Sequence, residues 1–230
     1  MGNPFQWEHD KAMQYNETIR KRILNYASIF EVMQDIVVTD CREVHSVAIV
    51  GAGGGQELST LIDVLPKACY FAIDPSEKML ELAKYRLIQE GKEADIQYIA
   101  KPFHEVEVDA VDLIICHLVL HFLQTDDEKR QLIQAISKRL KVGGTLFLSS
   151  INGKIGRADF EQQLDVWHVG MLRKGVTEKE WEKFRASIGE QLVPITDEEV
   201  VALLQQYGLS LLYHYEKTHV ITASYYVKIR

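Results

Sequence analysis

Three alternating glycines, followed by one acid, form the strongest chemical pattern in the sequence. Gly51, Gly53 and Gly55 follow a short apolar segment, and Asp74 ends the next one. Glycine lets the backbone turn sharply and lets a ligand approach the main chain, and the amides that open the next helix face that ligand. An acid at the end of the second strand can accept both ribose hydroxyls of a nucleoside. The glycines and Asp74 together predict a nucleoside-binding site.

Two other nucleotide-binding patterns do not match. The dinucleotide fingerprint requires a third glycine where this chain has Gln56, which disfavours a nicotinamide dehydrogenase. No segment has the spacing of a phosphate-binding P-loop. An acid before a proline, as in Asp74-Pro75, also occurs as a simple turn or helix cap. That simpler interpretation stays open for Asp74 taken alone.

Histidines and a cysteine supply the candidate reactive side chains. His117 and His121 come at the end of a strongly apolar segment, and histidine titrates near neutral pH, so either could act as a general base. A buried core histidine is the alternative for both, and we favour it for His121. His168, beside Trp167, could line a substrate site or lie on an amphipathic helix. Cys116 could be a nucleophile, but a buried small apolar side chain is the favoured interpretation.

The elements that must position these residues alternate along the chain. Residues from about 5 to 38 have helical periodicity. Short apolar segments that predict strands then alternate with helical patterns: strands at 44–50, 69–73, 96–100, 111–116 and 145–150, and helices at 56–65, 76–90 and 125–140. Such alternation predicts an α/β, Rossmann-like, doubly wound and mostly parallel sheet. Gly143 and Gly144 are expected to end the last of these helices.

The C-terminal part departs from that alternation. Two strands, at 209–216 and 223–229, have no helix between them and must pair antiparallel, which predicts a seven-stranded sheet closed by a hairpin. Residues 151–195 interrupt the pattern. Capping boxes at Thr125, Thr177 and Thr196 each predict the start of a helix; the second lies within this segment and the third directly follows it. We therefore expect one domain over 1–230, with an N-terminal helical cap (1–40), a core (41–150), a helical lid or substrate wall (151–195), and a final helix and hairpin (196–230).

Composition indicates which binding partners and which cellular compartment to expect. The formal net charge of −7 disfavours nucleic acid as a partner. Three cysteines without a CxxC pair indicate neither a disulfide framework nor a zinc site, so no metal is expected. The longest apolar run is too short and too interrupted to cross a membrane, and the first residues lack a signal-like stretch. We expect a cytoplasmic protein, either a monomer or a homodimer, without membrane contact.

In this order and at these spacings, the motifs resemble those of the class I S-adenosylmethionine-dependent methyltransferases. The resemblance covers about residues 44–150 and the C-terminal hairpin. Leu118–Leu123 is similar to the "vLhhl" segment that follows the fourth strand of that family, and Leu140–Leu146 is similar to its "LkpGGtl" entry to the fifth strand. Ile49 stands where the family often has an acid, and Lys101 begins a segment where many members have Gly-Asp.

The resemblance implies S-adenosylmethionine as cofactor, with S-adenosylhomocysteine as product. It places the glycines against the methionine part, Asp74 against the ribose, and Pro102 and Phe103 beside the adenine. The residues it implies for cofactor binding lie in the glycine loop and after strands two, three and four: Gly51, Ala52, Gly53, Gly55, Asp74, Pro75, Met79, Pro102, Phe103, Cys116 and His117. Trp7 and Tyr15 lie on N-terminal helices that often close over the cofactor in this family; core packing is their alternative.

The activity implied is methyl transfer to a small-molecule acceptor. His117, His121 and His168 are the candidate catalytic residues, and a base is needed only if the nucleophile arrives protonated. An RNA or protein methyltransferase is one alternative. The chain has Cys116-His117-Leu118-Val119 where methyltransferases of amino groups on bases or glutamine carry an Asn-Pro-Pro-Tyr motif. A non-catalytic binding protein that kept the fold is the other alternative, supported by Ile49 and Pro102.

Overall fold

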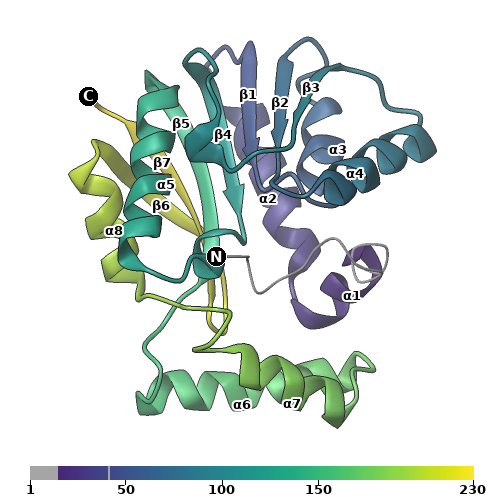
Figure 1. Ribbon diagram of the computed structural model, residues 1–230, viewed down its shortest axis with the longest axis vertical. Coiled ribbons are helices and arrows are strands. Elements are labelled where there is room, and N and C mark those ends of the chain that lie inside the picture. The colour runs from purple at the N-terminus through teal and green to yellow at the C-terminus, as the bar shows by residue number, and fades with distance from the viewer. Residues whose placement is uncertain (1–14, 41) are drawn as a thin grey trace.

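The computed structural model describes residues 15–40 and 42–230. One mixed sheet has the strand order β3-β2-β1-β4-β5-β7-β6 (Figure 1). The strands are β1 (Ser46–Val50), β2 (Cys69–Ile73), β3 (Asp95–Ile99), β4 (Val111–His117), β5 (Leu140–Ile151), β6 (Leu209–Thr218) and β7 (Ile221–Lys228). The first five are parallel, and β7 pairs antiparallel with both β5 and β6. The doubly wound sheet with its closing hairpin is confirmed.

Eight α-helices and two short 3₁₀ helices accompany the sheet in the described residues. They are α1 (Tyr15–Arg22), α2 (Tyr26–Thr39), α3 (Gln56–Ile62), α4 (Glu77–Glu90), η1 (Phe103–Glu105), η2 (Leu120–Phe122), α5 (Asp126–Arg139), α6 (Ala158–Arg173), α7 (Glu178–Ser187) and α8 (Asp197–Gln206). Complete capping boxes open α5, α7 and α8 at Thr125, Thr177 and Thr196, as the sequence predicts. None of the described helices is long and apolar enough to span a bilayer.

Alternate side chains along each strand enter two separate cores. Val47 and Ile49 pack with α2 and α3 on one face, while Ala48 and Val50 pack with α5 and α8 on the other. This alternation is the period of an extended strand buried on both faces. Figure 1 shows α3 and α4 on one side of the sheet and α5 and α8 on the other. The arrangement leaves the carboxyl edge of the parallel strands to the loops.

The described part of the N-terminal segment forms helices, as predicted, with a break between Arg22 and Tyr26 that separates α1 from α2. One strand begins earlier than the sequence predicts. Strand β5 begins at Leu140, directly after α5, so Gly143 and Gly144 lie within the strand and do not end the helix. The pairing of β4 with β5 shifts register there, and Gly143 has a φ of +82°. A bulge of this kind tolerates glycine because the local backbone is left-handed.

The insertion after β5 forms α6 and α7, so the helical prediction for this segment is confirmed. Trp167 on α6 donates a hydrogen bond from Nε1 to the Arg22 carbonyl at 2.6 Å. Lys174, just after α6, donates to the carbonyls of Arg20 and Leu24. In Figure 1, α6 and α7 form a layer beyond the end of the sheet, at the end where α1 also lies. The insertion and α1 therefore pack together.

Candidate active site

The glycine loop is held by main-chain bonds to the neighbouring strand. The amides of Gly51 and Ala52 donate to the Ile73 carbonyl at the end of β2, at 2.8 and 3.0 Å. Gly51, Gly53 and Gly55 all have positive φ, from +44° to +76°. These are left-handed conformations that residues with a Cβ adopt at a cost. The loop is thus a rigid main-chain surface at the carboxyl edge of the sheet.

Asp74 joins the loop to the start of α4. Its carboxylate accepts the Gly53 amide at 3.0 Å and the Ser76 amide at 2.9 Å. The side chain is buried, with 7% of its surface exposed. Met79 lies against the same loop, with its Cε 3.5 Å from the place where a Cβ on Gly53 would be. Pro75 is exposed. The structure therefore brings together the glycine loop, Asp74 and Met79.

Helix α1 covers the loop from the other side. Asn16 donates from Nδ2 to the Gly54 carbonyl at 3.4 Å, and Arg20 donates to Gln56 Oε1 at 2.8 Å. A Cβ on Gly54 would lie 2.0 Å from Asn16 Oδ1. That buried oxygen has no hydrogen-bond partner among the described residues. Glycine at position 54 is therefore what allows α1 to approach the loop.

Tyr15 lies beside this site, whereas Trp7 lies outside the described residues. Burial, and then the charges of Glu57 and Asp74, raise the pKa of Tyr15 above its ordinary value. Its hydroxyl is hydrogen-bonded to that of Tyr26 on α2. Burial is also the main cause of the raised pKa of Tyr26. The two phenols therefore stay neutral and form a polar wall next to the glycine loop.

His117, the last residue of β4, is buried in a polar cluster. Its Nδ1 lies 3.0 Å from Ser149 Oγ on β5, and its Nε2 lies 3.3 Å from the Tyr215 hydroxyl on β6. Leu118 follows with a φ of +57° and donates its amide to the Ser149 carbonyl. Such a conformation costs a non-glycine residue about 1–2 kcal/mol. The strained turn after β4 is fixed to β5 at the carboxyl edge.

His121 makes contacts typical of a structural histidine. Its Nδ1 accepts the Ile151 amide at 3.1 Å, which requires an unprotonated Nδ1, and its ring packs against Phe122. Burial lowers the pKa of His117 to about 3, and burial together with the Lys129 charge does the same for His121. Both imidazoles are therefore neutral at physiological pH and weak bases in this conformation.

Acid should destabilise the protein through these two histidines. Because their folded pKa values lie below the ordinary value of 6.5, the unfolded chain binds more protons between those limits. Stability then falls as pH drops from about 6.5 toward 3, by up to about 1.4 kcal/mol per pH unit for each histidine. We expect His117→Gln to reduce the change in unfolding free energy with pH by the contribution of one histidine, up to about 1.4 kcal/mol per pH unit. Urea unfolding from pH 4.5 to 7 measures it, and equal slopes in both proteins would contradict the assignment.

The other predicted site residues are distributed as follows. Phe103 is buried in the core formed with α5, with the Arg139 guanidinium 5.4 Å from its ring centroid, and Pro102 precedes it. Cys116 is fully buried, and desolvation raises the pKa of its thiol to about 12. His168 lies on α6, where it is 2.8 Å from Glu178 and stacked on Trp181. His168 thus joins α6 to α7.

Three polar residues of this region are missing from the sequence prediction. Tyr26 and Tyr215 are separated from the glycine loop along the chain, and nothing in their local sequence distinguishes them from core aromatics. Glu57 is different, because an acid directly after a glycine loop is visible in the sequence. Burial raises the pKa of Glu57 to about 7. Among the described residues, no three His, Cys, Asp or Glu side chains cluster as metal ligands would.

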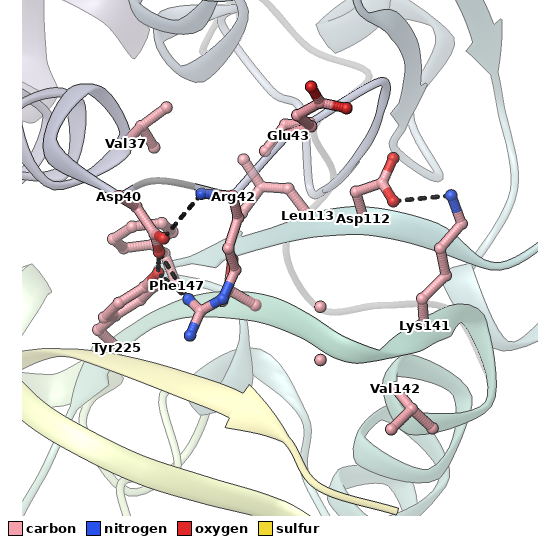
Figure 2. Close-up of a pocket in the computed structure, with 14 residues that line it drawn as sticks. Val37, Asp40, Arg42, Glu43, Asp112, Leu113, Lys141, Val142, Phe147 and Tyr225 are labelled. Atoms are coloured by element: carbon pink, nitrogen blue, oxygen red, sulfur yellow. Dashed lines mark hydrogen bonds and ion pairs between the residues drawn. The ribbon is translucent and has the colours of Figure 1, made fainter.

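A separate cavity of about 360 Å³ opens at the opposite edge of the sheet, and Figure 2 shows it. It lies at the amino ends of β4 and β5, lined in part by Leu113 and by Val142 on the bulge of β5. Four of its charged side chains form two ion pairs: Arg42 binds Asp40 at 2.6 Å, and Lys141 binds Asp112 at 2.7 Å. Because ligand sites of such sheets lie at the carboxyl edge, this cavity is not the candidate active site.

Comparisons with known proteins agree with this geometry. A family model described as a methyltransferase domain matches residues 49–146, which contain the glycine loop, Asp74 and β4. The match identifies a methyltransferase domain in this part of the chain, in agreement with the resemblance to the class I S-adenosylmethionine-dependent methyltransferases. The carboxy-S-adenosyl-L-methionine synthase of Shewanella piezotolerans is 26% identical over 90% of this chain and 85% of its own length.

Solved structures share the methyltransferase fold. The mitomycin 7-O-methyltransferase MmcR superposes with a TM-score of 0.66 at 16% identity, over 97% of this chain. An O-methyltransferase family 2 protein from Planctomyces limnophilus, solved with apigenin, has a TM-score of 0.68 at 14% identity, over 95% of this chain. The chain spans about 60% of the length of each of these two proteins.

Proposed function

We propose that this methyltransferase transfers the methyl group of S-adenosylmethionine to a small-molecule acceptor at the carboxyl edge of β1, β2 and β4. The observation that carries the proposal is the Asp74 carboxylate, held between the Gly53 and Ser76 amides at the end of β2. A nucleoside ribose is the ligand that an acid at this position recognises. The buried Asn16 Oδ1 beside the loop also fits a bound polar ligand, because buried polar atoms are normally paired.

The residues that would hold the cofactor lie on three sides of the loop. The main chain of Gly51 to Gly55 would contact the methionine part of the cofactor, and Asp74 would bind the ribose. Met79 would pack against the nucleoside. When bound, S-adenosylmethionine supplies a methyl group activated by its sulfonium. The chain itself excludes water and aligns the acceptor, and both effects accelerate a displacement of this type. The neutral His117 and His121 are weak bases, so alignment accounts for more of the proposed rate than proton abstraction.

The insertion supplies the proposed acceptor wall. Aromatic side chains join α6 to α7: Trp167 and Phe184 are in edge contact at 5.0 Å, and Trp181 stacks on His168 at 4.6 Å. Trp167 and Trp181 are buried, so these rings hold α6 and α7 together as one unit that would carry the acceptor wall. The neighbouring O-methyltransferase solved with apigenin is consistent with a small aromatic acceptor. The net charge of −7 disfavours an RNA acceptor.

Synthesis of carboxy-S-adenosylmethionine is a second candidate function. The observation that favours it is the match to proteins of that name over 85–89% of their length. In that reaction S-adenosylmethionine is the molecule modified, so the same nucleoside site would serve. The two functions differ in the nucleoside that leaves the enzyme.

Mass spectrometry of the nucleoside product separates these two functions. The purified protein is incubated with S-adenosylmethionine and either phenolic acceptors or small carboxylic acids as carboxyl donors. Methyl transfer yields S-adenosylhomocysteine, which is lighter by one CH₂, together with an acceptor heavier by the same group. Carboxylation yields a nucleoside heavier by one CO₂. Nucleoside binding without either product would instead support a non-catalytic binding protein.

A further inference from the structure

Glu57 is a buried carboxyl group next to the glycine loop. It is the second residue of α3, directly after Gln56, and only 7% of its surface is exposed. Its own amide is hydrogen-bonded to the carboxylate. Within residues 15–40 and 42–230, no ion pair or side-chain hydrogen bond links that carboxylate to another residue. Burying an ionised carboxylate destabilises the folded state unless a cation or hydrogen-bond donors pair with it. We therefore looked for such a group next to Glu57.

The surroundings of Glu57 place it on the cofactor side of the loop. Burial is the largest cause of the raised pKa values of Tyr15, Tyr26, Cys116 and Tyr215, and the Glu57 charge raises them further. These residues come from α1, α2, β4 and β6. These elements converge at the carboxyl edge of the sheet. The ordinary pKa values of these phenol and thiol groups already lie above physiological pH and are raised further here, so all four groups are neutral. They solvate a charge weakly and cannot neutralise it.

The charged residues near Glu57 do not form an ion pair or hydrogen bond with its carboxylate either. Arg86 on α4 lowers the pKa of Glu57, and Asp74 raises it. Arg86, however, directs its hydrogen bonds to Glu90 and to the Gly54 carbonyl. Arg20 on α1 donates to Gln56 and lies over the Tyr26 ring. A cation with N–H donors would satisfy the ionised carboxylate.

We propose that Glu57 binds the α-ammonium group of the methionine part of S-adenosylmethionine. This inference rests on the proposed function, because it requires the cofactor at the glycine loop. Ile49, where the family often has an acid, is fully buried in the core and carries no charge. The ammonium offers three N–H donors to a carboxylate, whereas the sulfonium offers none. In this proposal Glu57 binds the amino-acid end of the cofactor, and Asp74 binds the ribose.

Binding of three nucleosides tests this assignment by calorimetry. S-adenosylhomocysteine carries the ammonium without the sulfonium, S-adenosylmethionine carries both, and 5′-methylthioadenosine carries neither. We expect Glu57→Gln to weaken binding of the first two by about tenfold or more and to leave methylthioadenosine within about twofold. Glu77→Gln, an exposed acid at the start of α4, is the control and should change none of the three affinities.

Each other result overturns a defined part of the inference. An unchanged affinity for S-adenosylhomocysteine in Glu57→Gln removes the ammonium assignment. A loss confined to S-adenosylmethionine would assign Glu57 to the sulfonium instead. Equal losses for all three nucleosides, with a lower melting temperature, would give Glu57 a structural role. If the wild-type protein binds none of them, the proposed function itself fails, which is distinguishable from a defect limited to Glu57.

The pH dependence of binding gives a second readout. Burial raises the pKa of free Glu57 to about 7, and a bound ammonium lowers it, so binding releases a proton. Affinity for S-adenosylhomocysteine should therefore rise from about pH 6 to 8, by up to about tenfold per unit below the pKa of the free protein. Methylthioadenosine, and Glu57→Gln with either ligand, should show a flat profile. A titration of Asp74 would affect both ligands alike, and the His117 and His121 pKa values lie below this range.

Discussion

Asp74→Ala is expected to weaken binding of S-adenosylhomocysteine by at least about 100-fold, or about 2.7 kcal/mol. The change removes the proposed acceptor for the ribose hydroxyls. It also frees the Gly53 amide, which the carboxylate holds at 3.0 Å, so the loop loses one of its anchors. Titration calorimetry at a fixed pH measures the loss. Methylthioadenosine should lose affinity to the same extent, because it carries the same ribose.

Asp109→Ala supplies the matched control for Asp74. Asp109 is exposed in the loop before β4, and neither of its neighbours forms part of the candidate site. Its replacement should leave the affinity unchanged. A folded Asp74→Ala protein that binds S-adenosylhomocysteine within about twofold of wild type would show that Asp74 is only a cap for the turn before α4. In that case the simpler interpretation of Asp74-Pro75 would hold.

Gly55→Ala is expected to destabilise the protein by about 2–5 kcal/mol. Gly55 has a φ of +76°, and a Cβ there would lie 2.9 Å from Ala83 Cα and 3.0 Å from Ala83 Cβ on α4. The new methyl group therefore adds a clash between two packed elements to the cost of a left-handed conformation. Equilibrium unfolding in urea measures the change as a lower midpoint at unchanged slope.

Gly91→Ala separates the two causes. Gly91 ends α4 with a similar φ of +65°, but a Cβ there would meet no atom within 4 Å. Only the conformational cost, about 1–2 kcal/mol, should remain. If both variants lose the same stability, the close approach of α4 to the glycine loop contributes nothing. A larger loss in Gly55→Ala shows that α4 holds the loop in position.

Local patterns in the sequence were sufficient for the sheet elements and for one side of the site. Apolar segments with helices between them predict β1 to β5, because side-chain periodicity reports burial on one or two faces. The capping boxes at Thr125, Thr177 and Thr196 each span only four consecutive residues, so they are also visible in the sequence. The glycine loop and Asp74 are also visible in the sequence, because each depends on the backbone conformation of one short turn.

Tertiary structure decided everything that depends on distant groups. Only the folded chain brings Tyr215 to His117 across 98 residues and buries both histidines so that they stay neutral. The break between α1 and α2 and the bulge in β5 are likewise visible only in the tertiary structure. Glu57 is visible in the sequence as an acid after a glycine loop. Its unusual pKa comes from desolvation by helices and strands that converge on it from the whole chain, which no local pattern encodes.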